Sequence, residues 1–150
     1  MTGWIRSALV VTTIMLAYPA TAQTPAPPDA VVYIITPRDG QRVRSPMTVR
    51  FGLRNMGVTR AGDTTPNMGH HHLLVDVTEP LVENEPLPTD RRHLHFGAGQ
   101  TETQLELPPG QHTLQLVLGD AEHKPFKPLV ASKKVTVTVV PPRQPRTSAR

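Results

Sequence analysis

Hydrophobic and polar residues alternate along most of residues 31–140, in short segments separated by proline and glycine. A period of two residues is typical of β-strands that bury one face and leave the other in water. Seven segments have this pattern or are short apolar runs between turn signals, and none has a sustained period of 3.6 residues. The predicted strands are residues 31–36, 47–53, 71–77, 92–96, 101–107, 112–118 and 134–140.

Four of these segments have a clear apolar face. In residues 47–53 that face comprises Met47, Val49, Phe51 and Leu53. The inward faces expected for residues 112–118 and 134–140 begin with His112 and Val135. Residues 71–77 place His71, Leu73, Val75 and Val77 on one face, and His72, Leu74 and Asp76 on the other.

Short strands without helices favour an all-β domain over residues 31–140, and the most economical arrangement is an antiparallel two-sheet sandwich of immunoglobulin-like type. A small closed β-barrel is the alternative. The chain has no Cys and its single Trp is Trp4, so the disulfide and core Trp of a true immunoglobulin domain are missing. Pro46 and Pro141 lie at strand ends, where a missing N–H is tolerated.

Residues 1–22 are typical of a secretory signal peptide. Arg6 precedes the apolar run of residues 8–18, which is too short to span a bilayer, and Ala20-Thr21-Ala22 fits the cleavage rule for small residues. We therefore expect cleavage after Ala22 and a periplasmic or secreted protein whose mature chain has no transmembrane segment. Residues 23–30 are expected to form a proline-rich linker, and residues 141–150 a disordered basic tail.

Composition narrows the expected partners. The 150 residues carry 16 Lys and Arg against 12 Asp and Glu, a formal charge of +4. Residues 30–140 carry 12 basic and 11 acidic residues, so the excess lies mostly in the tail. We therefore expect no nucleic-acid partner for the folded part. The sequence does not indicate an oligomeric state.

Four segments resemble a known family. They are residues 69–76 (GHHHLLVD), 93–102 (HLHFGAGQTE), 107–114 (LPPGQHTL) and 118–120 (LGD) followed by His123. Together they resemble a bacterial exported family known as domain of unknown function 4399, over nearly all of residues 31–140. The resemblance implies a small exported domain and supplies no activity, so function has to be inferred from the residues.

Histidine is concentrated in one part of the chain. Five of the seven His lie between residues 70 and 95. Neutral imidazole is the commonest metal ligand in proteins. Residues i and i+2 share a face of a strand, about 6.5–7 Å apart, so His70 pairs with His72, and His93 with His95.

The expected topology brings some of these side chains to one rim. In an immunoglobulin-like order, the loops of residues 54–69, 97–100 and 119–132 lie at the same end of the sandwich. The candidate metal ligands are then His70, His72, His93 and His95, with His123 or Met68 as supplementary ligands. This set suits copper, zinc or nickel, and the thioether would also suit Cu(I). Asp76 is expected to orient an imidazole of the His70/His72 face.

Other interpretations of the His residues stay open. The His70, His72, His93 and His95 group could be a hydrogen-bonding network that ties loops down, or could bind an acidic or polar partner. His71 is interpreted as a hydrogen-bonded core residue. His112 is interpreted as structural, in the place where sandwiches use a corner Tyr bonded to upstream backbone.

The sequence favours binding over catalysis. It has no Gly-x-Ser-x-Gly motif and no glycine-rich phosphate loop followed by a helix. Glu102 and Glu106 are about 13 Å apart on one strand face, too far for a glycosidase pair.

We expect an exported, non-catalytic module with a His-rich rim that binds a transition metal. The alternative is an interaction module for an envelope protein or cell-wall polymer, in which the His cluster is structural. An enzyme with a His-bound metal is a third hypothesis, for which only Asp76 offers a base.

Overall fold

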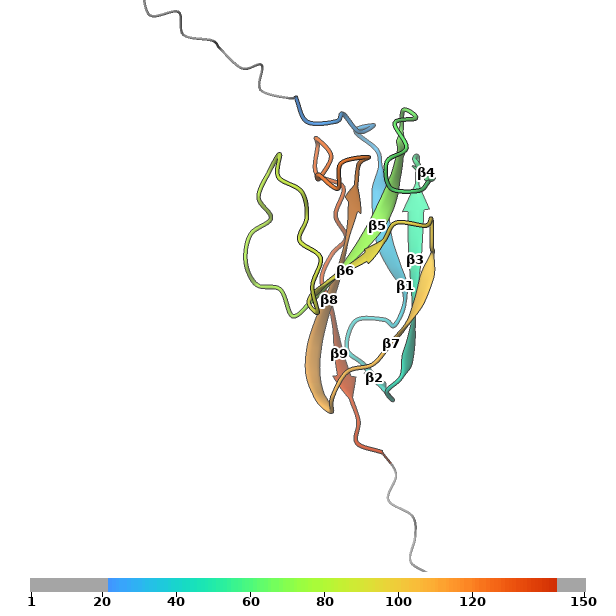
Figure 1. The fold of residues 1–150 in the computed structure, drawn as a ribbon. Coiled ribbons are helices and arrows are strands. Elements are labelled where there is room, and N and C mark those ends of the chain that lie inside the picture. Colours follow the sequence, from blue (N-terminus) through green and yellow to red (C-terminus); the bar gives the residue numbers. More distant parts are fainter. Residues whose placement is uncertain (1–21, 143–150) are drawn as a thin grey trace, which may run out of the picture.

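The computed structural model describes residues 22–142, which form nine strands and no helix (Figure 1). The strands are β1 (Val31–Thr36), β2 (Gln41–Val43), β3 (Met47–Arg54), β4 (Gly57–Val58), β5 (Met68–Val75), β6 (His93–Phe96), β7 (Glu102–Leu105), β8 (Gly110–Gly119) and β9 (Val135–Val139). All seven predicted strands are present, which confirms the all-β prediction. The sequence analysis missed β2 and β4, which are three and two residues long and have no measurable alternation.

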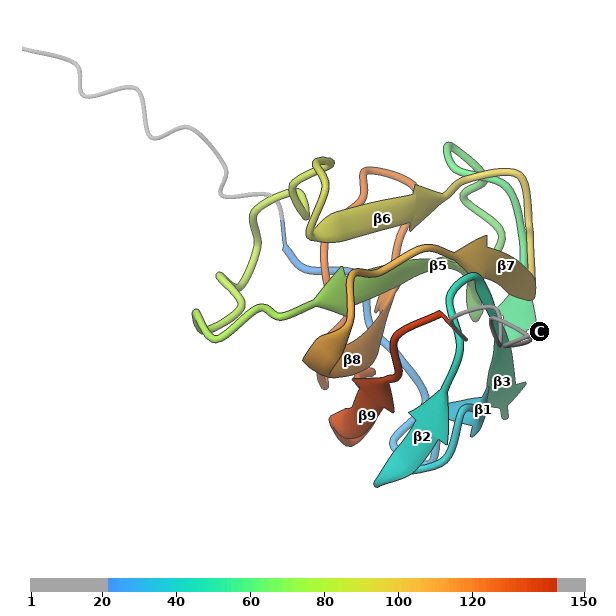
Figure 2. The ribbon, with the colours of Figure 1, turned by 90° about the horizontal axis from the view of Figure 1, so that it is seen from below.

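The strands form two sheets that pack as a sandwich (Figures 1 and 2). The smaller sheet has the order β1-β3-β7, and the larger has the order β2-β9-β8-β5-β4, with β6 also paired to β5. The longer pairs are antiparallel, whereas the short β2 and β4 run parallel to β9 and β5. The two-sheet sandwich predicted from the sequence is therefore present, and the finer immunoglobulin-like assignment stays a prediction.

The core lies between the two sheets. The predicted inward faces of β3, β8 and β9 contribute buried side chains to it, and their alternation explains why these segments form strands. The apolar side chains from these three strands are Met47, Val49, Phe51, Leu114, Leu116, Leu118, Val137 and Val139. A barrel closed by one continuous sheet is not formed by the described residues.

β5 is the central strand for function because it is buried on both faces. It lies between β6 and β8 and is hydrogen-bonded to both. Leu73 and Val75 face the main core, while Leu74 joins Val77 and Leu87 in a second cluster under the loop of residues 76–92. We predicted Val77 on the Leu73 face, and this was wrong. Asp76 has a φ of 54°, which ends the alternation after Val75.

The predicted signal peptide lies almost wholly outside the described residues, as does most of the predicted tail. Residues 23–30, predicted to be a linker, run along the loop after β8. Ala26 N donates to Lys127 O at 2.9 Å, and Lys127 N donates to Thr24 O at 3.0 Å. Ala26 and Ala30 are partly buried against the core. Within residues 22–142 there is no helix of the length and apolarity needed to span a membrane.

Candidate metal centre

Four His side chains converge where β5 begins and β8 ends. His70 and His72 come from β5, His95 from β6, and His123 from the loop after β8. One nitrogen from each ring lies within 4.8 Å of the corresponding nitrogens of the others. His72 Nε2 lies 3.0 Å from His70 Nε2, which in turn lies 3.1 Å from His123 Nδ1. We call these four residues the His cluster.

The register of the larger sheet explains this convergence. Strand alternation puts His70 and His72 on one face of β5 and His71 on the other. His72 is paired with His95 across the β5–β6 ladder, so their side chains lie side by side. His71 packs against Phe51 with ring centroids 5.1 Å apart, and its Nδ1 is 3.2 Å from Gln100 O. His71 is a core residue, as predicted, and one of its ring nitrogens has a backbone partner, whereas its buried Nε2 has no hydrogen-bond partner among the described residues.

Two glycines keep space free beside the cluster. A Cβ atom on Gly119 would lie 2.8 Å from His72 Nε2 and 3.5 Å from His70 Nε2. A Cβ atom on Gly97 would lie 2.5 Å from His95 Nε2. Any larger residue at either position would occupy the space next to these nitrogens, so the two glycines form a cradle around the cluster.

Burial favours the neutral form of His70, His72 and His95. His70 and His72 are fully buried, and His95 and His123 are half-buried. Burial, reinforced by the neighbouring imidazoles, lowers the pKa of His70 to about 4 and that of His72 to about 3. Burial also lowers the pKa of His95. These three rings are therefore neutral at pH 7, the form in which imidazole binds metal ions.

Two of the nitrogen–nitrogen distances in the cluster are close to those around a small metal ion, and all of them are within 4.8 Å. Imidazole nitrogens around tetrahedral zinc lie about 2.0–2.1 Å from the ion, which places them about 3.3 Å from one another. Two contacts in the cluster are 3.0 and 3.1 Å, close to that separation. His95 Nε2 is buried and has no hydrogen-bond partner among the described residues. The residues therefore fit a transition-metal ion held by imidazole nitrogen.

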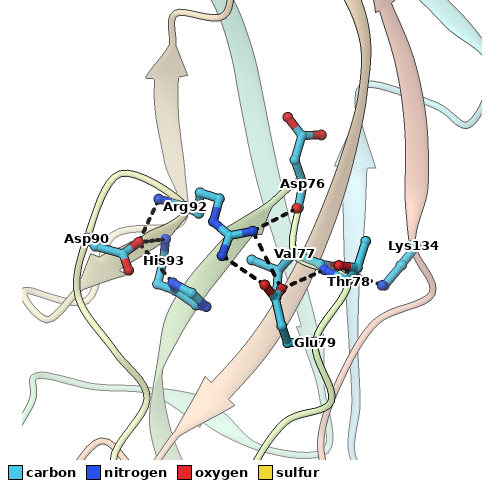
Figure 3. A network of polar contacts seen from close by, with 8 residues as sticks. All are labelled: Asp76, Val77, Thr78, Glu79, Asp90, Arg92, His93 and Lys134. Carbon is cyan, nitrogen blue, oxygen red and sulfur yellow. Dashed lines mark hydrogen bonds and ion pairs between the residues drawn. The ribbon is translucent and has the colours of Figure 1, made fainter.

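One of the six predicted ligands, His93, lies outside the group of four converging side chains. His93 is paired with Leu74, which lies two residues beyond His72 on β5. Its Nδ1 lies 2.9 Å from Asp90 Oδ1 (Figure 3). Met68 lies over Gly57 in β4, where a Cβ would collide with its sulfur atom. The four grouped residues are all histidines.

Asp76 does not orient an imidazole of the cluster, which corrects the prediction. Because the backbone turns at this residue, its carboxylate accepts from His112 Nδ1 at 2.7 Å and from Thr113 N at 2.8 Å. His112 Nε2 donates to Pro108 O at 2.9 Å. Both ring nitrogens of His112 are thus held, one of them by upstream backbone, as expected for a structural residue.

Sequence reasoning missed the residues that hold the loop carrying His123. Asp120 is 5% exposed, and its Oδ1 accepts from the backbone N–H groups of Glu122 and Lys124, both at 2.9 Å. Its Oδ2 accepts from Thr24 Oγ1 at 2.6 Å. The signal available was the Gly119-Asp120 pair three residues before His123, since Asp commonly caps turns through its own side chain.

Comparison with known proteins identifies the family of this chain. No curated protein and no solved structure matches the chain. The family described as Domain of unknown function (DUF4399) matches residues 49–140, a range that includes the whole His cluster and is more than half of the 150 residues. The family resemblance seen in the sequence is confirmed, and the chain belongs to the DUF4399 family.

Proposed function

We propose that this domain is a non-catalytic module that binds a transition-metal ion through the His cluster. The observation that carries the proposal is the approach of four imidazole nitrogens to within 4.8 Å of one another. Two of the four residues lie on a buried central strand, so burial and register hold their rings in place. Such a donor set suits Zn(II), Cu(II) or Ni(II).

The number of ligands favours binding over catalysis. Catalytic zinc sites use three protein ligands and leave one position for water, whereas closed structural sites use four. Asp120 is an acidic residue near His70, and its carboxylate accepts three hydrogen bonds, two from its own loop and one from Thr24. Because its oxygens are engaged in these contacts, Asp120 does not offer a general base to a metal-bound water.

The place of action is also part of the proposal. The N-terminal segment has the features of a cleaved signal peptide, which supports action in the periplasm or outside the cell. In that compartment the module would take up, store or pass on the ion. An exported domain whose four ligands are all imidazoles needs no thiol, which suits an oxidising environment.

The experiment uses the chain from Gln23 to Arg150, without an affinity tag and stripped with a chelator. Thermal unfolding is followed with Zn(II), Cu(II) and Ni(II). At 100 times its Kd, a metal ion adds about 2.7 kcal/mol to the free energy of unfolding, which raises the Tm by about 10 °C. We expect this shift for at least one of the ions.

A matched pair of variants on β6 locates the binding. His95→Gln removes a cluster ligand, and His93→Gln changes the same residue type two positions away, outside the cluster. The metal-induced shift should fall strongly in H95Q and stay intact in H93Q. Equal shifts in both variants, or no shift in the unaltered chain with any of the ions, would contradict the proposal.

A second candidate function has an observation of its own. The contacts from His72 to His70 and from His70 to His123 form a chain that joins β5 to the loop after β8 without any metal. In that case the cluster only stiffens the rim of a module that binds an envelope protein or cell-wall polymer. This alternative predicts that His123→Gln lowers the Tm of the metal-free protein and that no metal ion raises the Tm of the unaltered chain.

A further inference from the structure

We infer that residues 24–27 act as a clasp that fixes His123 in the metal centre and thereby sets how fast the ion leaves. The inference rests on the proposed function and assigns a role to Thr24, far from the cluster in sequence. It follows from how differently the ligands of the His cluster are held.

Two ligands are held by the sheet itself. His70 and His72 lie in β5, which is hydrogen-bonded to β8 on one side, and His72 is also paired with His95 of β6 on the other. Ladder hydrogen bonds fix the backbone of both residues in the middle of the larger sheet, and both rings are fully buried. The sheet and the packing around these rings therefore restrain them more than a loop would.

His123 is held by a loop. It has a φ of 66°, in the left-handed region that non-glycine residues rarely adopt, and its N–H donates to Asp120 O at 3.0 Å. Its own carbonyl accepts from Leu87 N at 2.8 Å. His123 is therefore the ligand whose position depends most on local turn geometry, and the one that can leave first.

Asp120 determines this turn. Its Oδ1 accepts from the N–H groups of residues on both sides of His123, Glu122 and Lys124, and its backbone N–H donates to Lys124 O at 2.9 Å. A rotation of this carboxylate would break both Oδ1 contacts and release the turn that presents the imidazole. The orientation of the Asp120 side chain thus controls the position of His123.

Thr24 fixes the orientation of that carboxylate. Its hydroxyl donates to the second oxygen, Oδ2, at 2.6 Å. The segment around Thr24 is itself anchored, because Ala26 N donates to Lys127 O and Lys127 N donates to Thr24 O. The path from the clasp to the ligand is continuous: Thr24 to Asp120, and Asp120 to the turn that carries His123. Thr24 is therefore a positioning residue for the metal centre.

The test compares three threonine variants of the Gln23–Arg150 chain, each loaded with Zn(II). Thr24→Val removes the hydroxyl and keeps the shape, Thr24→Ser keeps the hydroxyl, and Thr48→Val is the matched control. Thr48 makes an analogous side-chain contact, with Gln104 Nε2 at 2.8 Å, but between strands of the smaller sheet. Zinc affinity is measured by competition with a chelator, and release by rapid mixing with excess chelator.

We expect T24V to bind zinc about 10–100-fold more weakly, with faster release, because residues that orient metal ligands typically have effects of this size. T24S and T48V should behave as the unaltered chain does. Rescue by Ser separates a positioning role from a general loss of stability. Equal affinity and release for T24V and T24S would overturn the inference while leaving the proposed function intact. Absence of binding of Zn(II), Cu(II) and Ni(II) alike by the unaltered chain would overturn both.

Discussion

The domain uses histidine in two contrasting ways. In the His cluster, rings on separate elements point their nitrogens at one another, and burial lowers the pKa of His70 and His72. At His112 burial acts in the same direction, but the contacts with Asp76 and Pro108 outweigh it and raise the pKa. His112 has a carboxylate and a carbonyl as partners, so both of its ring nitrogens can carry a proton. Identical side chains thus form a candidate ligand set or a hydrogen-bonded structural contact according to their partners.

The largest expected effect is on metal binding. A double variant, His70→Gln with His72→Gln, removes both buried ligands and should abolish the metal-induced rise of about 10 °C in Tm. His112→Gln should leave that rise unchanged, because His112 lies outside the cluster. The measurement is the difference in Tm with and without metal for each protein. If the metal-induced rise in Tm disappeared in H112Q and persisted in the double variant, His112 would belong to the metal site and the His cluster would not.

The next effect concerns the space beside the cluster. Gly119→Ala puts a methyl group 2.8 Å from where His72 Nε2 lies, so the ring must shift. Overpacking of this kind costs about 1–3 kcal/mol, which corresponds to a 10–100-fold loss of metal affinity if the displaced ring is a ligand. Isothermal titration with Zn(II) measures the loss. Unchanged affinity in a folded G119A protein would show that this space is not part of the site.

The structural site should affect stability in a pH-dependent way. His112→Gln should lower the free energy of unfolding by about 1–2 kcal/mol, a reduced value for a charged contact because the Asp76 side chain is 42% exposed. The folded-state pKa of His112 is raised, so its contribution is complete below about 6.5 and is lost as the pH rises through the folded value. The pKa of Asp76 is lowered, so its contribution is complete above about 3.8 and is lost in acid.

The difference between the unaltered chain and H112Q should therefore be largest between about pH 4 and pH 6.5 and shrink in alkaline solution. Urea unfolding at a series of pH values measures it. A difference that grows above pH 8 would mean that neutral His112, and not the cation, stabilises the fold.

The smallest effect is expected at His93, which is separate from both the His cluster and His112. Its partner Asp90 is 53% exposed and lies on the loop that leads into β6. A contact to a partner that is exposed to water contributes little, so His93→Gln should change the free energy of unfolding by less than about 1 kcal/mol and leave metal binding unchanged. Urea unfolding combined with metal titration tests both statements. A loss of metal binding in H93Q would extend the cluster to a fifth residue.

Sequence patterns predicted the convergence of the His cluster because it follows from strand alternation and strand order. His70 and His72 share a face by the period of two, and the pairing of His72 with His95 follows once β6 lies beside β5. The same period also placed His93 with His95. It could not indicate that Asp90, three residues earlier, would hold the His93 ring.

The failures have local causes. Asp76 was assigned to the His70 face because alternation was extended one residue too far, past the point where the backbone turns to a φ of 54°. The roles of Thr24 and Asp120 depend on a contact across 96 residues, for which the sequence offers no periodic signal. β2 and β4 are too short for a pattern and exist because longer strands beside them offer hydrogen-bonding edges.

The most direct test of the metal centre is X-ray absorption spectroscopy of the tag-free chain loaded with one equivalent of Zn(II). The structure predicts stoichiometric binding and a first shell of four nitrogen atoms at about 2.0–2.1 Å, with the outer-shell scattering of imidazole rings. A shell of six oxygen atoms, or zinc that is removed by washing, would contradict the assignment of the His cluster as a zinc site, and the same result with Cu(II) and Ni(II) would contradict it as a metal centre.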